Sequence, residues 1–287
     1  MPGRTVVVTD STASLPPEVA AARGIVVVPL QVVIGAAVHD EGSPEATPAK
    51  VAAALREFVA VSTSRPAPAA LLEVYERLAA EGADQIVSIH LSGDMSGTFE
   101  SAQLAARQAG VPVTALDSRQ VGIATGFAAL SAVDVLEAGG SAADAVRAAG
   151  ERAAASSSLF YVDTLEYLRR GGRIGAAAAI FGGALAVKPL LTIAHGRVST
   201  LEKVRTSARA LSRLEDLAVE RAGDLLVDVS VAHLADEDRA DDLASRLQER
   251  LAANLGDREV WCGELGAVLG AHVGPGMLAV CVAPRPA

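Results

Sequence analysis

Residues 4–156 alternate between short β-branched runs and alanine-rich stretches, and this alternation constrains the fold more than any other feature. Apolar strands separated by helices favour a mainly parallel sheet covered on both faces, because parallel strands need long crossover connections. We therefore predict an N-terminal Rossmann-like α/β domain over residues 1–156. Its predicted strands are residues 4–10, 25–34, 85–91 and 112–118, and its predicted helices are residues 44–59, 68–81, 98–109, 122–138 and 142–155.

The pattern changes after residue 156, where hairpin signals mix with long helical stretches. The segment KPLLTIAHGRVSTLEKVR (188–205) indicates a hairpin that turns at His195-Gly196. This mixture predicts a C-terminal α+β domain with a largely antiparallel sheet over residues 157–287. The remaining predicted elements are a helix over 206–222, a strand over 224–234, a helix over 236–255 and three closing strands.

Charge and hydropathy narrow the classes of function. The chain of 287 residues carries a formal net charge of −9 with scattered basic residues, so we expect no nucleic-acid partner. The longest uncharged stretch, Ile174–Val187, is too short and too rich in glycine and alanine to span a bilayer. The N-terminus enters a predicted strand at once, without a signal peptide, so we expect a cytoplasmic protein. The two cysteines lack the paired spacing of a zinc site, so we expect no metal.

Polar loops follow three of the predicted strands of the first half. They are Asp10-Ser11-Thr12, Ser92-Gly93 and Asp117-Ser118. In an open parallel sheet, ligands bind beyond the carboxyl ends of the strands, which makes this edge a candidate site. Helix capping is the alternative role for Asp10-Ser11 and for Asp117-Ser118.

The stretch SGDMSGTFESA (92–102) places Ser96, Gly97 and Thr98 where a helix begins. Backbone N–H groups at a helix N-terminus are unpaired and favour an anion, and Gly97 permits a close approach. A nucleophile elbow would read G-x-S-x-G, whereas the second glycine here directly follows Ser96. A Walker loop would need a lysine, and none lies nearby. The stretch therefore favours holding an anion.

Two further stretches carry polar side chains. VSTSRPAP (61–68) contains Thr63 and Ser64, which the prolines could fix as rigid donors, and a loop with an ordinary N-cap is the alternative. GAHVGPG (270–276) contains His272, which we expect to end a strand before a tight turn. A lone histidine at a strand end is either a ligand contact or a satisfied structural residue.

Together these motifs resemble the DegV family of bacterial fatty-acid-binding proteins. TDSTASLP, TSRPAP, SGDMSGTFESA, TLEYLRRGGRIG and HVGPG occur in the family's order, and the resemblance extends from Val6 to about Val282. It implies two α/β domains that clasp one long-chain fatty acid, with the carboxylate near their interface and the tail buried. It also implies a non-catalytic subunit that presents the lipid to a separate ATP-binding fatty-acid kinase, which feeds acyl-phosphate into phospholipid synthesis.

The resemblance assigns roles by motif. Thr63 and Ser96 match the residues that hydrogen-bond the carboxylate, with His272 close by, while Arg173 and Arg205 match basic positions for a phosphate or partner contact. The segment AAAAIFGGALAVKPLL (176–191) either packs in the core or leaves room for the acyl tail. Arg65, Ala67 and Met95 depart from the glutamine, serine and leucine that are frequent in the family, which bears on tail preference or loop polarity.

Two enzymatic alternatives remain open. A serine hydrolase acting on acyl esters would use Ser96 and His272, although no third group can be assigned. A phosphohydrolase would use Asp10 as nucleophile, but Thr12 stands where the general acid belongs. Because the chain has no phosphate loop and no metal-ligand cluster, we expect no cofactor and no turnover by the isolated chain.

Overall fold

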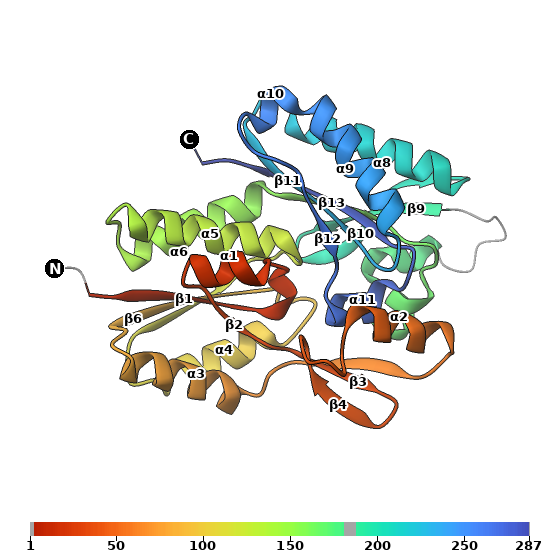
Figure 1. The fold of residues 1–287 in the computed structure, drawn as a ribbon. Helices are drawn as coiled ribbons and strands as arrows, with labels where there is room; N and C mark the ends of the chain where they lie inside the picture. The colour runs from red at the N-terminus through yellow and green to blue at the C-terminus, as the bar shows by residue number, and fades with distance from the viewer. Residues whose placement is uncertain (1–2, 181–187, 287) are drawn as a thin grey trace. The chain divides into compact units, whose positions relative to one another are not determined.

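The computed structural model describes residues 3–180 and 188–286. These residues form two compact units, one of residues 3–31, 64–155 and 286, the other of residues 32–63, 156–180 and 188–285 (Figure 1). Within the described ranges, no helix is both long and apolar enough to cross a membrane. Part of the segment 176–191 that could accommodate an acyl tail, residues 181–187, lies outside the described residues.

The first unit contains a four-stranded parallel sheet in the order β2-β1-β6-β7, which confirms the predicted parallel sheet. Its strands are β1 (Thr5–Asp10), β2 (Val26–Val28), β6 (Gln85–His90) and β7 (Val113–Asp117). Its helices are α1 (Pro17–Ala22), α3 (Pro68–Ala80), α4 (Thr98–Ala106), α5 (Ile123–Glu137) and α6 (Ala142–Ala155), with a 3₁₀ turn η1 (Ser11–Ala13).

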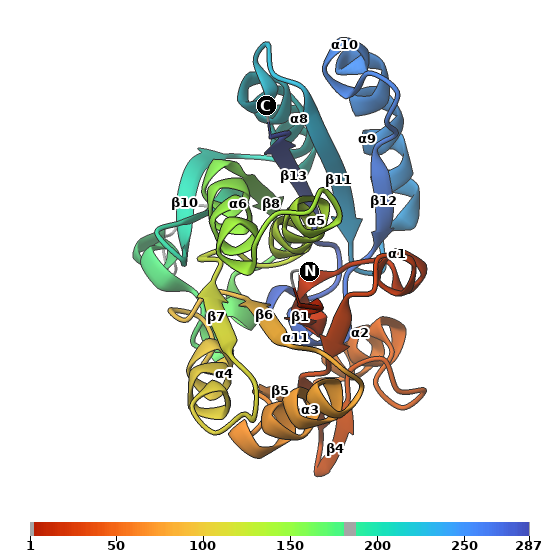
Figure 2. The ribbon, with the colours of Figure 1, turned by 90° about the vertical axis from the view of Figure 1, so that its left-hand side faces the viewer.

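Successive residues of β1 face opposite layers of helices. Val6 and Val8 pack with Leu71 of α3, while Val7 packs with Ala128 of α5 and Ala149 of α6. Side chains alternate across a strand, so an unbroken apolar run needs cover on both faces. Figure 2 shows the sheet of this unit with α3 and α4 on one face and α5 and α6 on the other.

The predicted strand 25–34 is wrong as a single element, because it divides at Pro29-Leu30. β2 pairs with β1, whereas β3 (Gln31–Ile34) joins a separate three-stranded sheet, β4-β3-β5. Proline has no N–H for a ladder, and the N–H of Leu30 donates instead to Ser11 Oγ at 2.9 Å. The other elements of this segment are β4 (Ala37–Asp40), α2 (Pro48–Arg56) and β5 (Val61–Ser64).

Helix α2 is shorter than the predicted helix 44–59. It begins after Thr47, whose hydroxyl caps the N–H of Lys50, and it ends at Arg56 before Phe58 with a φ of 60°. Helix α2 packs against α11 (Ala267–Val273), and Glu41 Oε1 accepts the N–H of Val268 at 2.7 Å. These contacts explain why residues 32–63 belong to the second unit, although they precede residue 156.

The second unit contains a six-stranded sheet in the order β10-β9-β8-β13-β11-β12, antiparallel except for the β11–β12 pair. The predicted hairpin is confirmed, with its turn at His195-Gly196, where both residues have positive φ. Its strands are β8 (Ser157–Tyr161), β9 (Lys188–Ala194), β10 (Arg197–Val204), β11 (Val227–His233), β12 (Trp261–Glu264) and β13 (Leu278–Pro284). Its further helices are α7 (Glu166–Arg170), η2 (Gly175–Ile180), α8 (Ser207–Ala222), α9 (Glu237–Arg250) and α10 (Ala252–Leu255).

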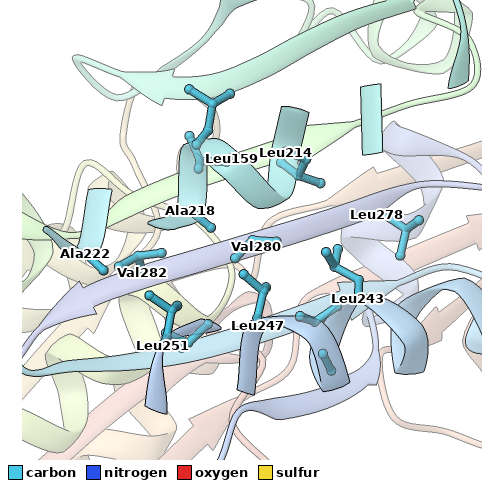
Figure 3. Packing of buried hydrophobic residues seen from close by; sticks show 14 of the residues in the cluster. Leu159, Leu214, Ala218, Ala222, Leu243, Leu247, Leu251, Leu278, Val280 and Val282 are labelled. Carbon is cyan, nitrogen blue, oxygen red and sulfur yellow. The ribbon is translucent and has the colours of Figure 1, made fainter. Parts of the chain in front are cut away.

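The core of the second unit lies between its sheet and two long helices. Leu214 of α8 and Leu243 of α9 pack with Val280 of β13, and all three are almost fully buried (Figure 3). Each fully buried aliphatic side chain contributes about 1.5–3 kcal/mol relative to exposure.

Of the three predicted closing strands, the middle one is wrong, because its place is taken by helix α11. His272 therefore lies in the last turn of a helix and does not end a strand. Glu41 caps the start of α11, and Gly274, with a φ of 76°, ends it. The cap comes from a residue far away in the sequence, so no local pattern could reveal it.

Candidate ligand-binding site

Thr63 and His272 meet in the second unit, where β5 approaches α11. Thr63 Oγ1 lies 2.8 Å from His272 Nε2, while Nδ1 of His272 is buried without a hydrogen-bond partner among the described residues. Burial, together with the nearby positive charge of Arg173, lowers the pKa of His272 to about 4. The imidazole is therefore neutral near pH 7, and it can serve Thr63 as a neutral hydrogen-bond partner.

Glycines leave space for the side chains of His272 and its neighbour Tyr167. A side chain at Gly171 would overlap Nδ1 of His272, and a side chain at Gly274 would overlap the ring of Tyr167. Arg173 is half-buried, and its guanidinium donates to the carbonyl of Gly171 at 2.6 Å. The motifs TLEYLRRGGRIG and HVGPG thus pack against each other, and this packing leaves no space for a side chain at Gly171 or Gly274.

Ser96, Gly97 and Thr98 lie together in the first unit. The carbonyl of Ser92 accepts the N–H of Ser96 at 3.1 Å, and Ser96 Oγ lies 2.9 Å from Thr98 Oγ1. Helix α4 begins at Thr98, so the predicted helix start is confirmed. Thr98 is fully buried and Ser96 is half-buried. Thr98 therefore fixes the position of the Ser96 hydroxyl, and the Ser96 side chain is the more accessible of the two.

Arg65 covers Gly97. Its Nη1 donates to the carbonyl of Gly97 at 3.1 Å and to Glu100 at 2.9 Å, and a side chain at position 97 would overlap the guanidinium. Arg65 can therefore occupy this position because Gly97 has no side chain. Ser64, which precedes Arg65, is exposed and donates to the Arg65 carbonyl at 3.3 Å.

The remaining predicted position, Arg205, is exposed between β10 and α8. Of the predicted site residues, the structure thus brings Thr63 together with His272 in one unit, and Ser96 together with Gly97 and Thr98 in the other.

Neither enzymatic alternative gains support from the contacts. Asp10 is fully buried, and both its carboxylate oxygens accept hydrogen bonds, so it lacks a free oxygen for attack. Ser96 Oγ contacts the hydroxyl and N–H of Thr98, while the low pKa of His272 makes it a poor base near pH 7. In the two described ranges, no three histidine, cysteine or acidic side chains are arranged to hold a metal ion.

Sequence reasoning did not identify three features of these clusters. They are the room made by Gly171 for His272, the position of Arg65 over Gly97, and a bond between Asp10 and His90. For His90 the sequence offers no signal beyond a polar residue at the end of a largely apolar strand.

Comparison with known proteins identifies a family and several relatives that this chain resembles in sequence. A family model described as "Uncharacterised protein, DegV family" matches residues 4–285. A DegV domain-containing protein of Streptomyces coelicolor is 52% identical over 279 residues, which cover 97% of this chain and 98% of the relative.

Two solved structures have the same fold. A fatty-acid-binding DegV family protein from Thermus thermophilus has a TM-score of 0.89 and 33% identity, covering 98% of this chain and all of its own. DegV, a fatty-acid-binding protein from Bacillus subtilis, has a TM-score of 0.89 and 32% identity, covering 99% of this chain and 100% of its own. With a family match over nearly its whole length and a close relative at this identity, the chain belongs to the DegV family.

Proposed function

We propose that this protein binds one long-chain fatty acid, with Thr63 and Ser96 donating hydrogen bonds to the carboxylate. Fatty-acid binding by the Thermus thermophilus and Bacillus subtilis relatives, both above 30% identity, supports the ligand class. The observation that carries the assignment of the head group is the bond between Thr63 and a neutral, half-buried His272.

The direction of that bond decides what Thr63 can do. An unpaired buried N–H is rarer in proteins than an unpaired acceptor, and Nδ1 of His272 has no partner among the described residues, which favours the proton on Nε2. Nε2–H then donates to Thr63 Oγ1, and the hydroxyl hydrogen of Thr63 is left to donate to a ligand oxygen. Because His272 is neutral, the carboxylate would keep its charge and its nucleophilic oxygen.

Head and tail would contribute different parts of the affinity. Hydrogen bonds to an ionised carboxylate are roughly twice as strong as neutral ones. The backbone N–H at Gly97 would add a further donor, and so would Ser64 if its hydroxyl exchanged the Arg65 carbonyl for the ligand. Each buried methylene of the tail contributes about 0.8 kcal/mol, so the acyl chain would supply most of the binding free energy. The hydroxyls would fix the position of the carboxylate.

Mass spectrometry of the purified protein after denaturing extraction tests the proposal, because a buried fatty acid should co-purify. On delipidated protein, Ser96→Ala should weaken fatty-acid binding roughly 10-fold to 100-fold, the loss of one charge-assisted bond. Ser62→Ala, an exposed hydroxyl next to Thr63 in β5, serves as the control and should bind like wild type. Absence of any co-purified or titratable fatty acid would refute the proposal.

We further propose that the protein presents its ligand, in the cytoplasm, to an ATP-dependent fatty-acid kinase subunit that forms acyl-phosphate for phospholipid synthesis. The half-buried Arg173 beside His272 could stabilise phosphoryl charge, and the exposed Arg205 could contact the partner. Arg173→Ala and Arg205→Ala should keep bound lipid but lose acyl-phosphate formation in a mixture with the kinase subunit. Arg221→Ala, exposed in α8, is the control. Loss of lipid by both variants would place these arginines in the acyl pocket.

A further inference from the structure

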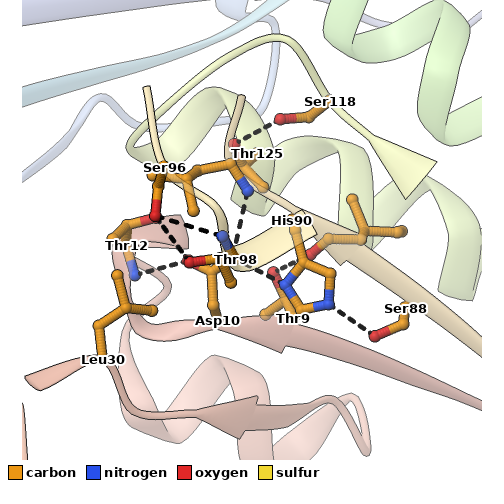
Figure 4. Close-up of polar contacts among 12 residues, drawn as sticks. Thr9, Asp10, Thr12, Leu30, Ser88, His90, Ser96, Thr98, Ser118 and Thr125 are labelled. Carbon is orange, nitrogen blue, oxygen red and sulfur yellow. Dashed lines mark hydrogen bonds and ion pairs between the residues drawn. The ribbon is translucent and has the colours of Figure 1, made fainter. Parts of the chain in front are cut away.

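A buried chain of hydrogen bonds crosses the first unit from α3 to the end of β1. Tyr75 Oη lies 2.8 Å from Ser88 Oγ, and Ser88 Oγ lies 2.8 Å from His90 Nε2. His90 Nδ1 in turn lies 2.9 Å from Asp10 Oδ2, and all four residues are fully buried. Figure 4 shows the His90 ring between Asp10 and Ser88. An ionised carboxylate carries only acceptors, so Nδ1–H of His90 donates to Asp10.

Asp10 also holds the first residues of two loops at the carboxyl edge of the parallel sheet. Its Oδ1 accepts the N–H of Thr12 at 3.1 Å and also the Thr12 hydroxyl, which fixes the turn after β1. Its Oδ2 accepts the N–H of Leu91 at 3.1 Å, directly after β6. With His90 included, the carboxylate accepts four hydrogen bonds, which accounts for a charged group at a fully buried position.

Two short steps connect Asp10 to Ser96. Asp10 fixes the N–H of Leu91, and the next residue, Ser92, uses its carbonyl to accept the N–H of Met95 at 3.0 Å and of Ser96 at 3.1 Å. Ser92 itself donates its N–H to the carbonyl of Gln120 at 2.8 Å. The backbone of Ser96 therefore takes its position from residues that the carboxylate of Asp10 orients.

We propose that Asp10, oriented by His90, is a positioning residue that fixes the Ser96 turn for carboxylate binding. The inference rests on the proposed function. Burial of a polar network seldom increases stability over apolar residues of similar volume, whereas it can specify one geometry. Here the geometry specified is that of the turn from Ser92 to Ser96.

The test compares fatty-acid affinity with stability in delipidated variants. Asp10→Asn keeps an acceptor for Thr12 but places an amide where Leu91 and His90 donate, and binding should weaken roughly tenfold. Val87→Ala, a buried β6 residue whose side chain has no part in the hydrogen-bond network, is the control. It should lower the melting temperature and leave affinity unchanged. An Asp10→Asn variant that binds like wild type would overturn the inference.

Two further measurements separate positioning from general destabilisation, and the first of them, on His90, remains usable if Asp10→Asn fails to fold. His90→Asn retains a donor near the place of Nδ1 and should bind almost normally, whereas His90→Leu should weaken binding several-fold. In a Ser96→Ala background, Asp10→Asn should add little further loss, because both changes act on one contact. Additive losses, or equal losses from both His90 variants, would overturn the inference. If Ser96→Ala alone left affinity unchanged, the proposed function of Ser96 would fail as well.

Discussion

The neutral state of His272 predicts a specific loss of stability in acid. A histidine in an unfolded chain has a pKa of about 6.5, whereas burial and the charge of Arg173 lower the pKa of His272 to about 4 in the folded protein. Between these values the unfolded chain binds the proton and the folded chain does not. The neutral imidazole therefore contributes stability that is fully present above about pH 6.5 and is lost as the pH falls towards about 4.

The magnitude follows from the two pKa values. A tenfold difference in proton affinity corresponds to about 1.4 kcal/mol, so full protonation would cost about 3 kcal/mol of the free energy of unfolding. Roughly 2 kcal/mol of this should be lost between about pH 7 and about pH 4.5. His272→Gln removes the titrating group, so the difference in unfolding free energy between wild type and variant should change by that amount over this range.

Urea unfolding of delipidated wild type and His272→Gln at several pH values measures the effect, because acidic groups common to both proteins cancel. Thr63→Val is the matched control: it removes the bond to Nε2 but keeps His272 and Arg173, so it should retain the wild-type pH dependence. Parallel loss of stability in wild type and His272→Gln would refute the assignment of a neutral histidine.

Packing around the glycines gives further predictions. Gly171→Ala should lower the free energy of unfolding by about 1–3 kcal/mol, because the new methyl group overlaps the His272 ring. Gly150→Ala, in α6 with open space around it, should instead raise that free energy by about 0.5–1 kcal/mol, and chemical denaturation compares the two. Gly97→Ala should displace Arg65, so its effect on fatty-acid affinity should be largely absent in an Arg65→Ala background. A full additional effect there would show that Gly97 acts independently of Arg65.

The sequence determined the elements whose signals are local. The helix start at Thr98 follows from a Ser-Gly-Thr stretch before an alanine-rich run, and the 188–204 hairpin follows from two apolar runs around His195-Gly196. The alternation of strands and helices likewise predicted the parallel sheet, because parallel strands need crossover helices. Resemblance to the family assigned Thr63 and Ser96 to the carboxylate with His272 close by, and the structure places Thr63 Oγ1 2.8 Å from His272 Nε2.

Only the tertiary structure decided which distant segments meet. Periodicity reports how often a side chain is buried but not what it packs against, so it could not separate β3 from β2 or identify helix α11. The bond from Asp10 to His90 joins residues 80 positions apart, and the bond from Thr63 to His272 joins residues 209 positions apart. The directions of such contacts depend on the packing of whole elements, so the neutral His272 and the positioning of Ser96 by Asp10 can be derived only from the folded chain.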